Sequence, residues 1–167
     1  FDDWVEIYNA GATPFDLGGK FVTDDLSEPS QWQIPTDNPS LTTIPAGGYL
    51  LLWFDGDEAQ GALHVSPKLS GSGEQIGIYE ADGITPIDTL TYGAQTKDIS
   101  EGRFPNGSST FLKFPIPSPG AVNSEPAPET VVLPTVSQIG GLYQAPLSLT
   151  LNTITDGATI YYTTDGS

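Results

Sequence analysis

The sequence predicts an all-β fold in which short antiparallel strands form a sandwich. Nineteen glycines and fifteen prolines among 167 residues favour turns over helices. Short apolar segments of strand length follow one another at regular spacing, with Gly, Pro and Asp between them, and no segment shows sustained helical periodicity. A chain of this length suits one or two domains and can bury a hydrophobic core.

Trp4–Tyr8 is the first predicted strand. Its residues alternate, so that Val5 and Ile7 point to one face and their neighbours to the other. The next segment, Phe15–Thr23, predicts a second pair of strands around its central Gly18-Gly19.

Two further segments differ in their expected place in a sheet. Gln31–Ile34 is short and predicts an edge strand, because Pro35 follows it and has no amide to donate to a neighbour. Tyr49–Phe54 is continuously apolar, which predicts a central strand covered on both faces.

The remaining strands of the first domain are expected on either side of clear turn signals. Glu74–Tyr79 and Ile87–Tyr92 flank Ala81-Asp82-Gly83, whose Asp-Gly pair predicts a hairpin. Phe111–Phe114 predicts the last strand before a proline-rich region. About seven short strands at this spacing fit a sandwich.

An ordered series of short motifs runs through residues 1–123. The series comprises Asp3–Asn9, Leu17–Asp25, Ile44–Trp53, Leu63-His64, Lys68–Ser70, Gly73-Glu74, Asp88–Gly93, Gly102–Ser108 and Pro117–Asn123. Taken in this order, the motifs resemble the bacterial lamin tail domain. The resemblance implies an immunoglobulin-like β-sandwich over residues 1–123.

The same resemblance implies a free strand edge. Lamin tail domains usually begin with an earlier strand that carries an Asn-Glu pair, and this sequence starts after it. Exposed edges invite pairing with another chain. We therefore expect either an edge-to-edge or swapped homo-oligomer, or an edge filled by the chain's own tail.

Residues 124–133 predict a Pro-rich linker, because prolines that alternate with charged residues favour an extended conformation. Residues 134–167 predict a partial second β-module. Within it, Gly140–Pro146, Leu147–Leu151 and Asp156–Ser167 resemble the front half of the immunoglobulin-like domain at the C-terminus of chitobiases and β-hexosaminidases.

A partial sandwich cannot bury both faces of its strands. If the second module is ordered, Leu147, Leu149 and Leu151 must therefore pack on the first domain or on a partner chain.

Composition argues against several function classes. A formal charge of −16 with only five Lys and Arg does not supply the clustered cations that nucleic acid or an anionic membrane surface requires. No apolar run is long enough to predict membrane insertion. The absence of cysteine removes disulfides, Cys-ligated zinc and thiol nucleophiles.

Catalytic signals are weak. His64 is the only histidine, and none of the serines near it lies in a Gly-x-Ser-x-Gly elbow. Carboxylate pairs arise by chance among 21 acidic residues, and the sequence shows no carboxylate in an obviously apolar pocket that would raise its pKa. The sequence therefore predicts a protein that is not an enzyme.

Clustered acidic residues suggest calcium, which prefers six to eight hard oxygen ligands. Asp55, Asp57 and Glu58 form the best candidate loop, although it lacks the spacing of an EF-hand. The alternative is a solvated acidic face on which Asp serves turn geometry. No other cofactor is expected.

Aromatic residues suggest a second kind of site. Trp32, between Gln31 and Gln33 on a short edge segment, is the best candidate for an exposed ring that contacts a glycan or a protein partner. The other tryptophans and most tyrosines lie in predicted strands, where aromatic side chains usually belong to the core.

A third set of residues predicts a structural turn. Gly102–Gly107 resembles the family's Arg-aromatic-Pro-Asp-Gly turn, with Asn106 in place of the usual Asp. We expect Arg103 to pair with a carboxylate and fix this turn rather than to bind a ligand.

The sequence thus predicts a non-catalytic module of a larger bacterial surface or secreted protein. Its expected role is anchoring, spacing or protein interaction outside the cell. The alternative is a carbohydrate-binding accessory module, with or without structural calcium.

Overall fold

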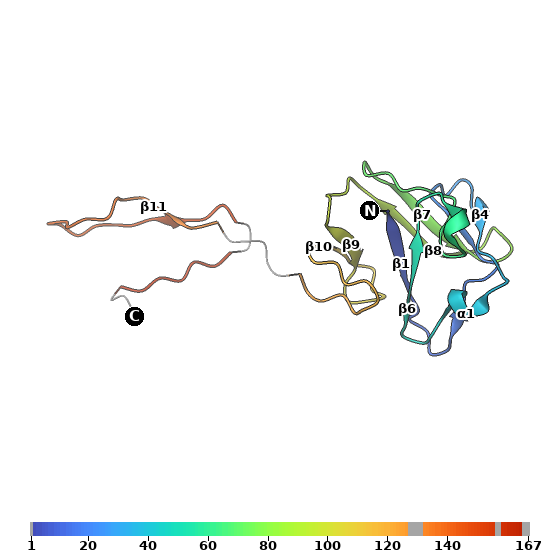
Figure 1. The fold of residues 1–167 in the computed structure, drawn as a ribbon. Helices are drawn as coiled ribbons and strands as arrows, with labels where there is room; N and C mark the ends of the chain where they lie inside the picture. The colour runs from blue at the N-terminus through green and yellow to red at the C-terminus, as the bar shows by residue number, and fades with distance from the viewer. Residues whose placement is uncertain (1, 127–131, 156–157, 165–167) are drawn as a thin grey trace. The chain divides into compact units, whose positions relative to one another are not determined.

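The computed structural model describes residues 2–126, 132–155 and 158–164. The chain divides into two compact units, Phe1–Pro126 and Ala127–Ser167, each of which is described by itself. Figure 1 shows the strands of both units, and almost all regular structure is antiparallel β-sheet. The fold is all-β and its first unit is an immunoglobulin-like sandwich, as the sequence predicts.

A four-stranded sheet with strand order β4-β3-β7-β8 forms one layer of the first unit. Its outer strands are β4, which pairs with β3, and β8, which pairs with β7. The predicted edge strand and the predicted hairpin both occur in this sheet. The bounds are β3 (Phe21–Thr23), β4 (Trp32–Gln33), β7 (Glu74–Tyr79) and β8 (Pro86–Tyr92).

Three two-stranded sheets complete the first unit: β1-β6, β2-β5 and β9-β10. Two short helical turns, α1 (Pro39–Thr42) and η1 (Glu58–Gln60), lie in its connections. The strand bounds are β1 (Trp4–Tyr8), β2 (Phe15–Asp16), β5 (Thr43–Ile44), β6 (Tyr49–Trp53), β9 (Ser100–Arg103) and β10 (Phe111–Phe114).

The core lies between these sheets. Leu52 of β6 and Ile78 of β7 belong to one buried cluster, which joins the two layers. Each of these strands contributes alternate residues, as a half-buried pleated strand does. The other buried members of the cluster are Leu17, Val22, Ile34, Ile44, Phe54 and Val65.

Two expectations about individual strands are wrong. The strands around Gly18-Gly19 do not pair with each other, because β2 pairs with β5 whereas β3 pairs with β4 and β7. The backbone of Gly19 has φ +79°, and its amide donates to the carbonyl of Ile34, so the turn moves the chain from one sheet to another.

The continuously apolar segment 49–54 is not a central strand. Within the described residues, β6 forms a ladder only with β1, and on its other side Trp53 makes a single bridge with His64. Loops cover its outer face: Trp53 stacks beside the His64 ring, and Tyr49 accepts a hydrogen bond from Asn106. Partial burial by loops explains apolar residues on both faces without a second sheet.

The second unit contains a small antiparallel pair, β11 (Thr135–Val136) and β12 (Leu151–Asn152). Leu147 and Leu149 are exposed and Leu151 is half-buried, so the packing expected for these leucines stays a prediction. Residues 127–131, half of the predicted linker 124–133, lie outside the described residues, as do residues 156–157 and 165–167 of the second module.

Candidate functional site

A wide cavity opens in the first unit between β1 and β9. Its volume is about 1160 Å³, above the range of about 300–1,000 Å³ that is typical of small-molecule pockets. Consecutive residues of both strands, Trp4–Tyr8 and Ser100–Arg103, line it. If only one face of a strand lined the cavity, every second residue of that strand would contribute. Because consecutive residues contribute, both strands present an edge to the cavity. We call this cavity the trench.

The inner wall of the trench is apolar. Val5 and Ile7 of β1 pack against the buried core, yet both stay partly accessible because the trench opens beside them. Ile76 of β7 and Leu90 of β8 are cross-strand partners that line the same wall. Burial raises the pKa of Tyr92, the last residue of β8, to about 12.

One end of the trench is closed by a polar network. Asn106 Nδ2 donates to the Tyr49 hydroxyl at 2.8 Å, and the backbone amide of Asn123 donates to Asn106 Oδ1 at 3.0 Å. Asn123 Nδ2 donates to the Arg103 carbonyl at 3.0 Å. The 117–123 segment is therefore tied to the turn that follows β9.

A second bond connects that segment with β1. The Gly120 amide donates to Glu6 Oε1 at 2.6 Å. Burial raises the pKa of the Glu6 carboxyl above its usual value, while the bond from Gly120 opposes that rise. Glu6 thus fastens the 117–123 segment beside the trench.

Arg103 fastens β9 to the opposite layer. One of its guanidinium nitrogens lies 2.8 Å and 3.0 Å from the two carboxylate oxygens of Asp88 on β8. Another donates to the Ser108 carbonyl at 2.8 Å, and the guanidinium lies 4.7 Å from the centre of the Phe111 ring. The predicted structural residues Arg103 and Asn106 therefore lie at the same turn and both hold neighbouring strands.

The acidic loop after β6 is organised around His64. Its Nδ1 lies 2.6 Å from Asp55 Oδ2, and the Asp55 side chain is only 6% exposed. Asp55 Oδ1 accepts the Asp57 amide at 2.9 Å. The pKa of Asp55 is lowered, first by the bond from Asp57 and then by the bond from His64.

The other proposed calcium ligands lie apart from this pair. Asp57 and Glu58 are exposed at the start of η1. In the ranges that the structure describes, no group of three or more His, Cys, Asp or Glu side chains is close enough to hold a metal ion. Both oxygens of Asp55 already accept bonds within the protein, and calcium binding at this loop stays a prediction.

The Trp32 segment also has a structural role. Trp32 is half-buried and packs against the core. Gln31 Oε1 accepts bonds from the Thr23 hydroxyl and the Asp24 amide, and Gln33 Nε2 donates to the Gly19 carbonyl. Each glutamine amide is therefore engaged within the fold. Ligand contact at these three residues stays a prediction.

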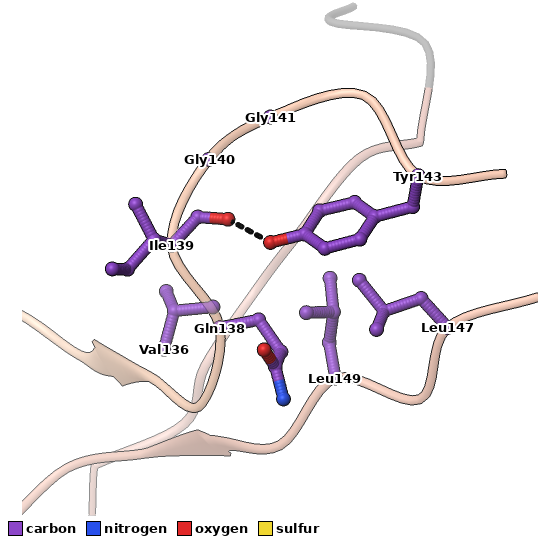
Figure 2. A pocket seen from close by; sticks show the side chains of 8 residues that line it. All are labelled: Val136, Gln138, Ile139, Gly140, Gly141, Tyr143, Leu147 and Leu149. Carbon is purple, nitrogen blue, oxygen red and sulfur yellow. Dashed lines mark hydrogen bonds between the residues drawn. The ribbon is translucent and has the colours of Figure 1, made fainter. Parts of the chain in front are cut away.

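A smaller apolar hollow lies in the second unit. Figure 2 shows Val136, Ile139, Leu147 and Leu149 around it, with the Tyr143 hydroxyl donating to the Ile139 carbonyl. The Tyr143 bond closes a loop over this hollow, which is about 340 Å³ in volume.

Sequence reasoning did not predict the trench. In the described residues β1 pairs with β6 alone, and the expected edge-to-edge or swapped homo-oligomer stays a prediction. The prediction did not include β9, whose Ser-Glu-Gly-Arg sequence has no apolar residue to signal a strand. Glu6 and Asn123 were not singled out either. The closing Asn of the 117–123 motif was the available signal for Asn123.

No helix in the described parts of the chain has both the length and the apolar character to span a bilayer. Two family models match the chain: the Lamin Tail Domain at residues 1–94 and the Chitobiase/beta-hexosaminidase C-terminal domain at residues 138–167. Neither the curated proteins nor the solved structures contain a match. The two matched models are immunoglobulin-like accessory domains, in the order that the sequence motifs indicate. Because the first model covers more than half of the residues, the chain belongs to the lamin tail domain family.

Proposed function

We propose that this chain is a protein-interaction module of a larger bacterial surface or secreted protein. In this role it performs no catalysis; it anchors or spaces other domains. The succession of two immunoglobulin-like accessory domains in one chain carries the proposal. In the described residues the trench adds accessible apolar surface with a polar rim, which is typical of a protein interaction site.

The tandem arrangement supports the same role. Both matched families are immunoglobulin-like accessory domains rather than catalytic ones, and they follow each other along one chain. The single histidine is engaged by Asp55 and stacks beside Trp53, which fits a structural role in its loop.

Charge favours a protein partner over nucleic acid. The trench lies in a chain of net charge −16, and phosphate-binding surfaces need clustered cations. An apolar wall instead gains free energy from buried hydrocarbon, at about 25 cal/mol per Å².

The partner class can be tested by selection from a displayed library of random peptides on the immobilised chain, run beside a glycan array. We expect enriched peptides whose binding changes the accessibility of the trench, and no glycan signal. Binding of glycans without any peptide enrichment would contradict a protein-interaction role.

A location outside the cell is a separate part of the proposal. High acidity and the absence of cysteine fit a solvated extracellular domain. Brief protease treatment of intact producing cells should release peptides of this chain, while a cytoplasmic marker stays uncut. Protection of the chain until the cells are lysed would contradict the surface location.

Carbohydrate binding is the alternative function, and Trp32 is its test. Trp32 is half-buried, so part of this residue is accessible to solvent. If glycans bind there, chitin oligosaccharides will shift tryptophan fluorescence in the native chain and not in Trp32→Phe. Equal shifts in both proteins would place any glycan contact elsewhere.

A further inference from the structure

The turn after β9 contains a pair of residues with a chemistry of their own. Among the asparagines of the sequence, Asn106 alone precedes a glycine. Asparagine is thermolabile, because the backbone nitrogen of the next residue can attack its side-chain carbonyl carbon. A Cβ on that next residue hinders the attack, and Gly107 has none. The pair Asn106-Gly107 therefore has the intrinsic reactivity for deamidation.

The nucleophile of this reaction is the Gly107 backbone nitrogen. Gly107 is exposed, and within the described residues its amide makes no hydrogen bond. Solvent can therefore accept the amide proton, and no bond of the fold has to break to release this nitrogen.

The electrophile, Asn106 Cγ, is held in place. Asn106 is half-buried, and both polar atoms of its side chain are bonded: Nδ2 donates to the Tyr49 hydroxyl at 2.8 Å, and Oδ1 accepts the backbone amide of Asn123 at 3.0 Å. Cγ cannot swing to the Gly107 nitrogen while both bonds persist. The side-chain contacts therefore slow the reaction.

The backbone of the turn opposes ring closure as well. The Ser108 amide donates to the Pro105 carbonyl at 3.0 Å, Gly107 has φ +76°, and Asn106 does not have a positive φ. These features define a type II turn, in which ψ of Asn106 is about +120°. At this ψ the Gly107 nitrogen lies on the far side of the Cα–C bond from Cβ, so the turn must open before the ring can close.

The partners of Asn106 suit the product of deamidation. In the described residues the Tyr49 hydroxyl accepts from Asn106 and donates to no acceptor. Burial raises the pKa of Tyr49, so this hydroxyl keeps its proton at neutral pH. A carboxylate at position 106 would accept both the Tyr49 hydroxyl and the Asn123 amide, and hydrogen bonds to a charged acceptor are stronger than neutral ones.

We propose that Asn106 is a site of spontaneous deamidation, which the closed turn slows and whose aspartate product the turn retains. The Gly107 nitrogen forms a bond to Cγ, and Nδ2 leaves as ammonia with the proton of the Gly107 amide, which gives a cyclic imide. Water then opens the imide. Attack at Cγ gives aspartate, whereas attack at the backbone carbonyl carbon gives isoaspartate, whose main chain runs through Cγ.

The two products differ in their effect on the 117–123 segment. Aspartate keeps an oxygen where Asn106 Oδ1 accepts the Asn123 amide. In isoaspartate the main chain is one atom longer and Cγ becomes part of it, so this acceptor is lost. Ageing of the chain therefore yields one form with the segment held to the turn and one form with the segment released.

The first test compares the full chain with the blocked peptide Arg-Phe-Pro-Asn-Gly-Ser-Ser, which is residues 103–109, in the same neutral buffer. Mass spectrometry of proteolytic fragments measures the conversion of Asn106 and separates aspartate from isoaspartate. We expect the folded chain to react about thirtyfold more slowly than the peptide, since two ordinary hydrogen bonds, about 2 kcal/mol together, must break and 1.4 kcal/mol is a factor of ten. The chain unfolded in urea should react at the rate of the peptide in the same urea solution.

A pair of variants tests the contact that holds Asn106. Tyr49→Phe removes the hydroxyl that accepts from Nδ2. The matched Tyr8→Phe removes the hydroxyl of the ring beside it, 5.1 Å away between centroids, which makes no hydrogen bond to Asn106. We expect Tyr49→Phe to deamidate about fivefold faster than the native chain, the factor that one ordinary hydrogen bond contributes, and Tyr8→Phe to react at the native rate.

A second pair of variants tests whether the product is retained. Asn106→Asp reproduces the aspartate form, and Asn106→Ala removes both partners of the turn. Hydrogen exchange of the full chain should show the Asn123 amide protected in Asn106→Asp as in the native chain, and exchanging faster in Asn106→Ala.

Three results would overturn the proposal. Reaction of the folded chain at the rate of the peptide would mean that the turn does not hold Asn106 back, and this comparison is informative even if Tyr49→Phe does not fold. Absence of any reaction at Asn106 in both the native chain and Tyr49→Phe, in a period long enough for a thirtyfold slower reaction, would mean that the fold prevents deamidation. Loss of Asn123 protection in Asn106→Asp would show that the turn rejects the carboxylate.

Discussion

At the scale of single residues, Arg103 links β9 to β8 and β10. It contacts Asp88 on β8, the Ser108 carbonyl and the Phe111 ring. We expect Arg103→Ala to lower the free energy of unfolding by about 1–2 kcal/mol, since its charged hydrogen bonds are partly exposed to solvent. Urea denaturation measures this change. Lys113→Ala, which removes a positive charge from an exposed position on β10, should change it far less, and equal losses would contradict the role of Arg103.

The Asp55–His64 pair predicts a dependence of stability on pH. The pKa of Asp55 is lowered in the folded chain, first by the Asp57 amide and then by His64. A carboxyl with a lowered folded pKa stabilises the fold above its unfolded pKa, and this contribution is lost as the pH falls through the folded pKa. Asp55→Asn should therefore lower the melting midpoint at neutral pH, with the difference from the native chain shrinking below about pH 4. Asp57→Asn keeps its backbone amide and serves as the control; a difference for Asp55→Asn that is constant with pH would refute the ionic explanation.

Residue roles were predictable only where local sequence defines them. The pairing of Arg103 with a carboxylate follows from the chemistry of a lone guanidinium in an acidic chain, but its partner Asp88 lies 15 positions away. The Trp32 ring looked exposed because its segment is short, yet tertiary packing against the core half-buries it. Pairs that form across sheets depend on register, which one sequence does not specify.

At the scale of elements, alternation and turn signals predicted the strands well, and pairing partners poorly. The β7-β8 hairpin followed from an Asp-Gly turn between two apolar segments. Apolar residues on both faces of segment 49–54 predict a central strand, whereas in the structure loops cover one of these faces. β9 lacks apolar residues, so hydrophobic pattern alone could not reveal one edge of the trench.

The β7-β8 turn yields a prediction of its own. Asp82 Oδ1 accepts hydrogen bonds from the Ile84 and Thr85 backbone amides, and Asp82 Oδ2 accepts one from the Thr85 hydroxyl. These bonds lower the pKa of Asp82 to about 2, and the bond from the Thr85 amide is the largest cause. Asp82→Ala should destabilise the chain above pH 4, and the difference should disappear between about pH 4 and about pH 2 as the native carboxyl becomes protonated. Glu28→Ala, an exposed carboxylate outside this hairpin, is the control. Melting curves across this pH range decide the matter, and a loss that persists at pH 2 would point to packing rather than charge.

At the scale of the whole molecule, the chain carries two immunoglobulin-like accessory domains in succession, and this order supports the proposed interaction role. The first unit builds a buried core of its own. In the second unit Leu147 and Leu149 are exposed, although both belong to an alternating apolar segment. Such a segment predicts a further packing partner for the second unit, and measuring hydrogen exchange of 147–151 in the full chain would show whether that segment is covered in solution.

The net charge of −16 predicts how ions affect stability. Self-repulsion among acidic residues destabilises a compact chain, and salt weakens it as the Debye length falls from about 30 Å at 0.01 M to about 8 Å at 0.15 M. We expect sodium chloride to raise the melting midpoint.

Calcium and magnesium, compared at equal ionic strength after EDTA treatment, should raise the melting midpoint to the same extent, because Asp55 already accepts bonds from His64 and Asp57. A larger rise of the melting midpoint with calcium, lost in the double variant Asp55→Asn, Asp57→Asn, would instead establish the loop as a calcium site. Calcium at a hundredfold excess over its dissociation constant would then add about 2.7 kcal/mol to the free energy of unfolding.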